Sequence, residues 1–149
     1  MSEVGFYHLT STPLERALPV LLGRTLEAGE RAAVLAPTQE LISALDAALW
    51  DIPTPAWLPH GTDSDGDAAL QPIWLATTEP VPNGARFLFL TCGAETARWT
   101  DYTRIFDLFD GSDAAAVTAA RRRWQAARAA GAAPTYWQQG PHGWERKAG

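Results

Sequence analysis

Cysteine and histidine are scarce in this chain of 149 residues, which has one Cys and three His. The single cysteine, Cys92, excludes an internal disulfide framework and a cysteine-rich metal site, and such low usage is typical of a reducing compartment. His8, His60 and His142 lie far apart in the sequence and lack the spacing of a zinc site. We therefore expect neither a bound metal nor another cofactor.

Long apolar runs are also missing. No stretch approaches the roughly 20 apolar residues that span a bilayer, and the first residues do not follow the basic, apolar, small order of a signal peptide. The sequence thus predicts a cytoplasmic protein without a membrane partner. With 149 residues, 46% of them apolar, the chain is expected to fold as one domain over 1–149.

Glycine is absent where a nucleotide-binding fold needs it. The turn after the first predicted strand, residues 9–13, has no glycine, and Pro13 has no amide hydrogen to donate to a phosphate. Neither a Gly-x-Gly-x-x-Gly run nor a Walker A run occurs. Cys92 has no evident base partner, and no Gly-x-Ser-x-Gly elbow is present, so no catalytic residue is expected. A small nucleotide-dependent α/β enzyme is the weaker alternative.

The acidic residues Asp63, Asp65 and Asp67 give residues 61–68 a partial likeness to a calcium-binding loop. That loop requires a glycine after the third acid and a glutamate at its twelfth position. Here the glycine is at 66 and position 74 is tryptophan, so a solvated acidic loop is the simpler interpretation.

Negative charge dominates the chain but not its end. The net charge is −5, yet residues 112–149 carry five Arg, one Lys and two acids and are net +4. An acidic protein lacks the broad positive footprint of a duplex-DNA binder, so no direct contact with duplex DNA is expected. The basic end favours a small anionic partner, unless it forms only a solvated helix face.

Short apolar segments alternate with segments of helical periodicity. Strands are expected at 4–9, 31–36, 71–77, 86–91, 104–109 and 135–138, with a further extended segment at 56–59. Helices are expected from a capping box of Thr12 and Glu15 to Gly29, from Thr38 to Trp50, at 95–100, and from a Ser112 cap to Ala130. The alternation predicts an α/β fold with a mostly parallel sheet flanked by helices on both faces, Rossmann-like in its three layers but without a phosphate-binding loop.

The last predicted helix has two distinct faces. One consists of small residues that would let the helix lie close to the sheet: Ala116, Ala120, Ala127 and Ala130. A neighbouring stripe, at spacings of four, three and four, contains Val117, Arg121, Trp124 and Arg128. A tryptophan between two arginines suits a ligand with a hydrophobic side chain beside a carboxylate. The alternative is that Trp124 belongs to the core and the arginines are solvated.

Seven tryptophans are many for a chain of this length, and aromatic residues are enriched at protein interfaces. Trp57 lies between Pro55 and Pro59 in a segment predicted to be extended. It is either a core residue or an aromatic anchor on a partner surface.

A series of short segments, in one order and at matching intervals nearly from end to end, resembles a known family. The segments are 6–9 (FYHL), 45–50 (LDAALW), 58–61 (LPHG), 71–73 (QPI), 83–84 (NG), 107–111 (DLFDG), 123–131 (RWQAARAAG) and 135–139 (TYWQQ). Together they are similar to the chi subunit family of DNA polymerase III, an accessory subunit of the clamp loader.

The resemblance implies a non-catalytic adaptor of the polymerase III holoenzyme in DNA replication. Members of the family bind the psi subunit, which tethers chi to the clamp loader. They also bind the acidic, phenylalanine-terminated tail of single-stranded DNA-binding protein, and so link the clamp loader to the coated lagging strand. The fold implied is related to nucleotide-binding domains but has no phosphate loop.

Carried over by position, the resemblance places the tail site on the last helix. It implies that Arg121 binds the terminal carboxylate, that Trp124 forms a wall for the phenylalanine ring, and that Arg128 attracts the aspartates of the tail. Val117 belongs to the same stripe, and Tyr136 is expected beside the pocket. The psi surface maps to the segment around Trp57. Direct binding of single-stranded DNA by exposed tryptophans and arginines is a further alternative.

Overall fold

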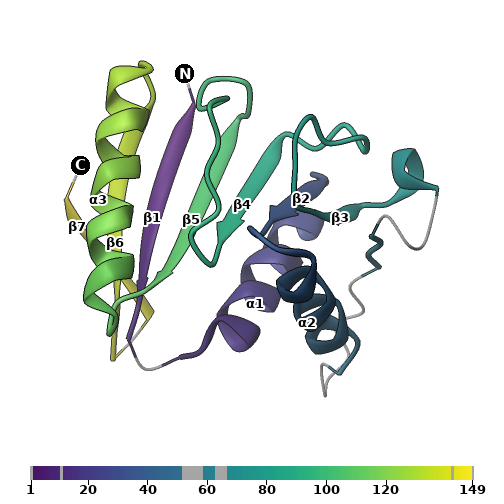
Figure 1. The fold of residues 1–149 in the computed structure, drawn as a ribbon, viewed down its shortest axis with the longest axis horizontal. Coiled ribbons are helices and arrows are strands. Elements are labelled where there is room, and N and C mark those ends of the chain that lie inside the picture. The colour runs from purple at the N-terminus through teal and green to yellow at the C-terminus, as the bar shows by residue number, and fades with distance from the viewer. Residues whose placement is uncertain (1, 11, 52–58, 63–66, 142, 149) are drawn as a thin grey trace.

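The computed structural model describes residues 2–10, 12–51, 59–62, 67–141 and 143–148. Within these residues it contains a seven-stranded sheet and three α-helices (Figure 1), which confirms the predicted α/β class. The strands are β1 (Glu3–Leu9), β2 (Ala32–Leu35), β3 (Ile73–Ala76), β4 (Phe87–Thr91), β5 (Arg104–Asp110), β6 (Ala133–Gly140) and β7 (Gly143–Ala148). The helices are α1 (Leu14–Glu27), α2 (Gln39–Trp50) and α3 (Ala114–Ala129), with a short 3₁₀ turn, η1 (Ala68–Leu70).

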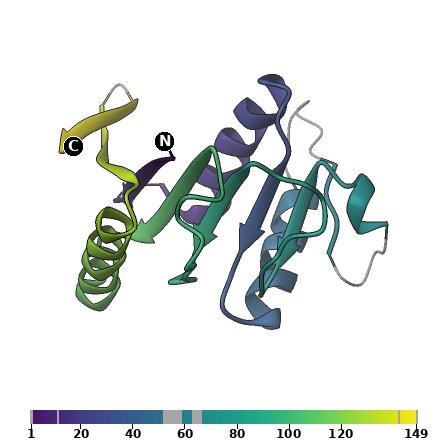
Figure 2. The ribbon, with the colours of Figure 1, turned by 90° about the horizontal axis from the view of Figure 1, so that it is seen from above.

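The strands lie in the order β3-β2-β4-β5-β1-β6-β7. Every neighbouring pair is parallel except β6 and β7, which are antiparallel. Helix α3 and strands β6 and β7 lie at one end of the molecule, while α2 and β3 lie at the other (Figures 1 and 2). The mostly parallel sheet is therefore as predicted, with one antiparallel edge strand added.

Helices cover both faces of the sheet, as predicted. One core lies between the sheet and the helices α1 and α2, and it includes Leu18, Leu22, Ile42 and Leu45. The second core lies on the α3 side and includes Phe6, Phe109, Ala120 and Ala127. Because successive strand residues point to opposite faces, Phe6 of β1 and Tyr136 of β6 face α3, whereas Tyr7 and Trp137 face α1.

Burial along the strands follows from these two layers. All four residues of β2 and all four of β3 are buried, which is why both segments are continuously apolar. Strand β7 has no neighbour beyond it in the sheet, and five of its six residues are exposed. Its sequence, GWERKA, has no apolar run, and the sequence-based prediction missed it.

Helix α1 begins differently from the prediction. Pro13 is its N-cap and no side chain caps the helix, so the predicted capping box of Thr12 and Glu15 is wrong. The backbone N–H of Thr12 instead donates to Oε1 of Gln139 at 3.2 Å, a contact from β6. A contact with a residue so distant in sequence is invisible to a local capping pattern.

The start of α3 also needs a correction. Its N-cap is Asp113, whose carboxylate accepts the backbone N–H groups of Ala115 at 3.0 Å and Ala116 at 3.5 Å. Ser112, the predicted cap, donates its hydroxyl to Oδ1 of Asp110 at 2.6 Å and so belongs to the turn after β5. The carboxylate of Asp113 is also favoured at the positive end of the helix dipole. The predicted stop is confirmed, since the helix ends just before Gly131, which has a φ of 91°.

Two other predictions have different outcomes. Residues 95–100 form bends and turns rather than the expected short helix. The extended segment expected at 56–59 lies, apart from Pro59, outside the described residues. In the described part of the chain, no helix is both long enough and apolar enough to cross a membrane.

Candidate functional site

Helix α3 lies close to the sheet because the residues that face the sheet are mostly small. Ala120 and Ala127 are buried, as the alanine stripe predicted, and they bring the helix against Phe6 and Phe109. The stripe is shorter than predicted, because Ala116 is only partly buried and Ala130 is exposed.

A buried ion pair lies in the middle of the interface between α3 and the sheet. Arg123 lies between the two buried alanines and donates from Nε to Oδ2 of Asp107 at 2.6 Å and from Nη2 to Oδ1 at 3.0 Å. The side chains are 5% and 1% exposed. Burial raises the pKa of Asp107 to about 6, while the hydrogen bonds and the charge of Arg123 act in the opposite direction.

The sequence itself contains a signal for this pair. Asp107 is the one charged residue inside the apolar run of β5, and Arg123 is three residues after Ala120 and four before Ala127. An arginine on the alanine face of a helix and an acid inside a buried strand each need a partner. Their combination predicts an internal ion pair.

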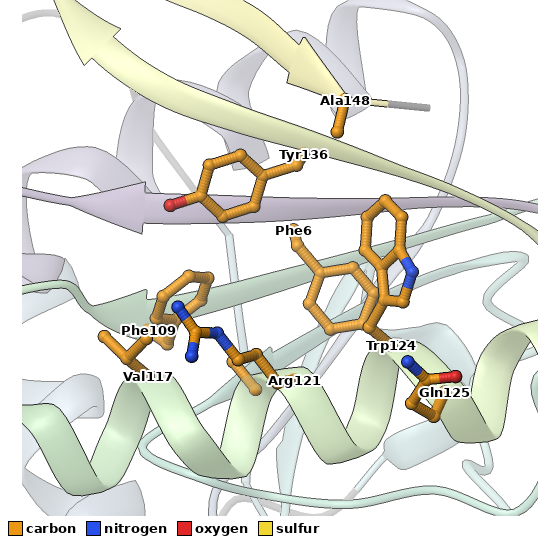
Figure 3. Close-up of a pocket in the computed structure, with 9 residues that line it drawn as sticks. Phe6, Phe109, Val117, Arg121, Trp124, Gln125, Tyr136 and Ala148 are labelled. Atoms are coloured by element: carbon orange, nitrogen blue, oxygen red, sulfur yellow. The ribbon is translucent and has the colours of Figure 1, made fainter.

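Beside this interface lies an open pocket of about 440 Å³ between α3 and the sheet (Figure 3). Side chains from β1, β5, α3, β6 and β7 line it: Phe6, Phe109, Val117, Ala120, Arg121, Trp124, Gln125, Tyr136 and Ala148. Residues far apart in the sequence therefore meet in one cavity, because β1 is flanked by β5 and β6 in the sheet.

One end of the pocket is aromatic. The rings of Phe6 and Trp124 lie with centroids 5.5 Å apart and planes inclined by 52°, and Figure 3 shows them side by side. Phe6 is buried, whereas Trp124 is only partly buried and keeps a surface toward the cavity. This arrangement can receive one more ring in a tilted or edge-to-face contact.

The other end of the pocket is polar. The hydroxyl of Tyr136 and the guanidinium of Arg121 point toward this end, where Val117 and Phe109 also lie (Figure 3). Burial raises the pKa of Tyr136, and the nearby charge of Arg121 opposes that rise. The phenol hydroxyl therefore keeps its proton at neutral pH, and it is hydrogen-bonded to Nδ1 of His8.

The two arginines that bracket Trp124 are exposed. Among the described residues, neither Arg121 nor Arg128 forms an ion pair or a hydrogen bond through its guanidinium, in contrast to Arg123. Their charges remain available to an outside anion. Arg121 lines the pocket, while Arg128 is not among the described residues that line it.

Four of the predicted site residues therefore meet: Val117, Arg121, Trp124 and Tyr136. Arg128 lies on the same helix, one turn beyond Trp124. Trp57, predicted for a different surface, lies outside the described residues. The pocket residues that the sequence-based prediction did not assign to the site are Phe6, Phe109, Ala120, Gln125 and Ala148.

A second cavity, of about 670 Å³, lies at the carboxyl ends of β1 and β5, where a nucleotide would bind in a related fold. Its charged lining includes Glu15, Asp110 and Asp113, and its only basic lining residue among those described is Arg123, which is paired with Asp107. Pro13 occupies the start of α1 without an amide hydrogen. The described residues that line this cavity do not supply the positive charge that favours a phosphate.

A model of the family described as DNA polymerase III chi subunit, HolC, matches residues 1–135. The match includes the strands that supply Phe6 and Phe109 and the whole of α3, and it stops just before Tyr136. No curated protein sequence matches the chain. Because this family model matches well over half of the chain, the chain belongs to the DNA polymerase III chi subunit family, a non-catalytic accessory subunit of the polymerase III holoenzyme in DNA replication.

Proposed function

We propose that this chi-family chain is an adaptor that holds the carboxyl-terminal tail of single-stranded DNA-binding protein in the pocket beside α3. The observation that carries the proposal is an open cavity with an aromatic wall at one end and an unpaired guanidinium at the other. A peptide that ends in phenylalanine has a ring and a carboxylate on the same residue. The two ends of the pocket match these two groups.

In this proposal each end of the pocket has a defined role. The terminal phenylalanine ring packs against Trp124, with Phe6 behind it, in a tilted aromatic contact. The terminal carboxylate accepts hydrogen bonds from Arg121, whose planar guanidinium can bind both carboxylate oxygens. Val117 lines the pocket beside Arg121, and Tyr136 lines the opposite side.

Arg128 acts outside the pocket. It is exposed and lies one helical turn from Trp124, so the acidic residues that precede the terminal phenylalanine pass near its charge. Exposed charge pairs of this kind contribute more to the association rate than to affinity, and added salt screens them. Because a coated DNA strand displays many tails, weak single contacts gain strength through avidity.

We further propose that the psi subunit binds the segment around Trp57. Two exposed apolar side chains, in the elements that precede and follow this segment in the sequence, support a partner surface: Trp50 at the end of α2 is 61% exposed, and Leu70 of η1 is 73% exposed. The ring of Trp50 lies 4.5 Å from that of His60, which shows that the two ends of segment 51–59 are close together. Tryptophan and other aromatic residues are enriched at protein interfaces.

Calorimetry with a synthetic peptide of aspartates ending in phenylalanine tests the tail site. Arg121→Ala should lower the affinity about tenfold or more, because it removes the charge-assisted hydrogen bonds to the carboxylate. The matched control is Arg122→Ala, which removes an exposed arginine from the same helix outside the pocket. It should bind the peptide like the wild type.

Both variants should melt within a degree or two of the wild type, since exposed arginines contribute little to stability. Equal affinity of the Arg121→Ala variant and the wild type would refute the site. Tight binding of a bare oligonucleotide, without the peptide, would favour the alternative of direct single-stranded DNA binding.

A further inference from the structure

His8, on β1, lies next to the pocket without lining it. Its Nδ1 is hydrogen-bonded to the hydroxyl of Tyr136, and the two rings meet edge to face with centroids 5.8 Å apart. The imidazole also lies against Phe109, with centroids 5.3 Å apart. Gly111 leaves room for it, since a Cβ at that position would lie 1.8 Å from the His8 ring. The ring is therefore held in place on three sides.

The direction of the hydrogen bond between His8 and Tyr136 depends on where the imidazole proton is. When Nδ1 carries no hydrogen, it can only accept, so the Tyr136 hydroxyl must donate to it. That hydroxyl then has no hydrogen left for a ligand. When the imidazole is protonated, both ring nitrogens carry hydrogen, Nδ1 donates to Tyr136, and the phenol hydrogen is free to turn into the pocket.

Other charged groups act on this pair from the neighbouring elements. Asp110, at the end of β5, is held ionised because hydrogen bonds from Ser112 lower its pKa, and its charge also interacts with His8. Asp113, the N-cap of α3, is a second carboxylate at this end of the sheet. Arg121 faces Tyr136 from α3.

We propose that His8 is a positioning residue for the pocket, and that its protonation turns the Tyr136 hydroxyl into a donor to the carboxylate of a bound peptide terminus. The inference rests on the proposed function of the same pocket. Arg121 and Tyr136 then hold the carboxylate together, and the imidazolium adds positive charge behind them. Histidine is suited to this role because its charge ordinarily changes between pH 5 and 8.

Calorimetry with the acidic, phenylalanine-terminated peptide at pH 8, 7 and 5.5 tests the inference. The wild type should bind about tenfold more tightly at pH 5.5 than at pH 8, the value of one added hydrogen bond to a charged group. At pH 6.5 binding should take up protons, seen as a difference in heat between phosphate and Tris buffers. His8→Gln, which has no ionisable ring, should flatten the affinity profile and abolish the proton uptake.

Two controls keep the test independent of folding and of the peptide's own charges. Tyr136→Phe keeps the ring and removes only the hydroxyl, so only the weaker pH dependence that comes from the imidazolium charge should remain. A peptide with an amidated terminus has no terminal carboxylate, so its affinity should lose the dependence on His8. Arg122→Ala should keep the wild-type profile, because it lies outside the pocket.

The outcomes separate this inference from the function on which it rests. Wild-type protein that binds equally well at pH 5.5 and 8 overturns the role of His8 and leaves the tail site standing. A His8→Gln variant with the wild-type profile and proton uptake also overturns it. Wild-type protein that binds the peptide at no pH overturns the proposed function, and this inference falls with it.

Discussion

Replacing Arg123 with methionine removes the guanidinium that faces Asp107 inside the protein. The two hydrogen bonds of the pair, at 2.6 and 3.0 Å, join side chains that are almost fully shielded from water. Methionine fills much of the same volume but leaves the carboxylate buried without a counter-charge. Breaking a buried pair in this way costs about 3–5 kcal/mol, so we expect the free energy of unfolding at pH 8 to fall by that amount.

The cost of Arg123→Met depends on pH because Asp107 can take up a proton. Burial raises the pKa of Asp107 from 3.8 to about 6 in the folded protein, so the folded state holds a proton that the unfolded chain has already lost. The stability contributed by this group is fully present below pH 3.8 and is lost as the pH rises through 6, by about 3 kcal/mol in all. Without Arg123 the pKa rises further. The cost of Arg123→Met should therefore be less than half as large at pH 5.5 as at pH 8.

Urea denaturation followed by circular dichroism measures these free energies. The double variant Asp107→Leu/Arg123→Met removes both charges, and buried pairs replaced by apolar residues are often neutral, so its stability should return close to that of the wild type. Asp107→Asn should remove the fall in stability between pH 4 and 6. If Arg123→Met loses less than about 1 kcal/mol at pH 8, or if the double variant loses the sum of the two single losses, the pair does not hold α3 as argued.

Two further predictions concern the start of α3 and the proposed psi surface. Asp113→Ala should lower the free energy of unfolding by about 1 kcal/mol in thermal melts, because two backbone N–H groups lose their cap, and Asp113→Ser should restore most of that loss; equal melting of all three proteins would contradict the cap assignment. Trp57→Ala should abolish co-purification with psi while tail-peptide affinity stays at the wild-type value, and unchanged co-purification would remove Trp57 from the psi surface.

Much of the fold was predictable because its signals are local. Strands β2 and β4 are apolar runs that the sheet buries on both faces, and their positions agree with the prediction within two residues. Helix α2 begins at the predicted Thr38, whose hydroxyl accepts the N–H of Leu41. In each case the residues that decide the structure lie within a few positions of one another.

The sequence-based predictions failed where a residue distant in the sequence decides the local structure. Strand β7 exists because its backbone pairs with β6, and an exposed edge strand has no burial pattern to reveal it. The amide of Thr12 is bound by Gln139, so the predicted capping box had no role. Ser112 and Asp113 are both good caps by type, and the hydrogen bonds from Ser112 to Asp110 decide between them.

The residues of the candidate site also divide into those that were predictable from local spacing and those that were not. The stripe of Val117, Arg121 and Trp124 was predictable because helical spacing alone places these side chains together. Phe6 and Phe109 were not, because they reach the pocket only through the placement of β1 and β5 beneath α3. Helical spacing therefore predicts the side of the pocket that α3 forms. The side that β1 and β5 form depends on the order of the strands in the sheet.

Four arginines lie within eight residues of α3, and the buried pair determines which of them can serve a ligand. Because Arg123 is anchored to Asp107, the rotation of the helix about its axis is fixed, and Trp124, the next residue, must lie at the edge of the interface. Arg121 and Arg128 then lie away from the core and keep their charges. A rotation by one residue, about 100°, would carry Arg123 away from Asp107 and break the buried pair, at a cost of several kcal/mol. The internal ion pair therefore specifies the orientation of the site more than it stabilises the fold, and its loss should weaken tail binding even in variants that remain folded.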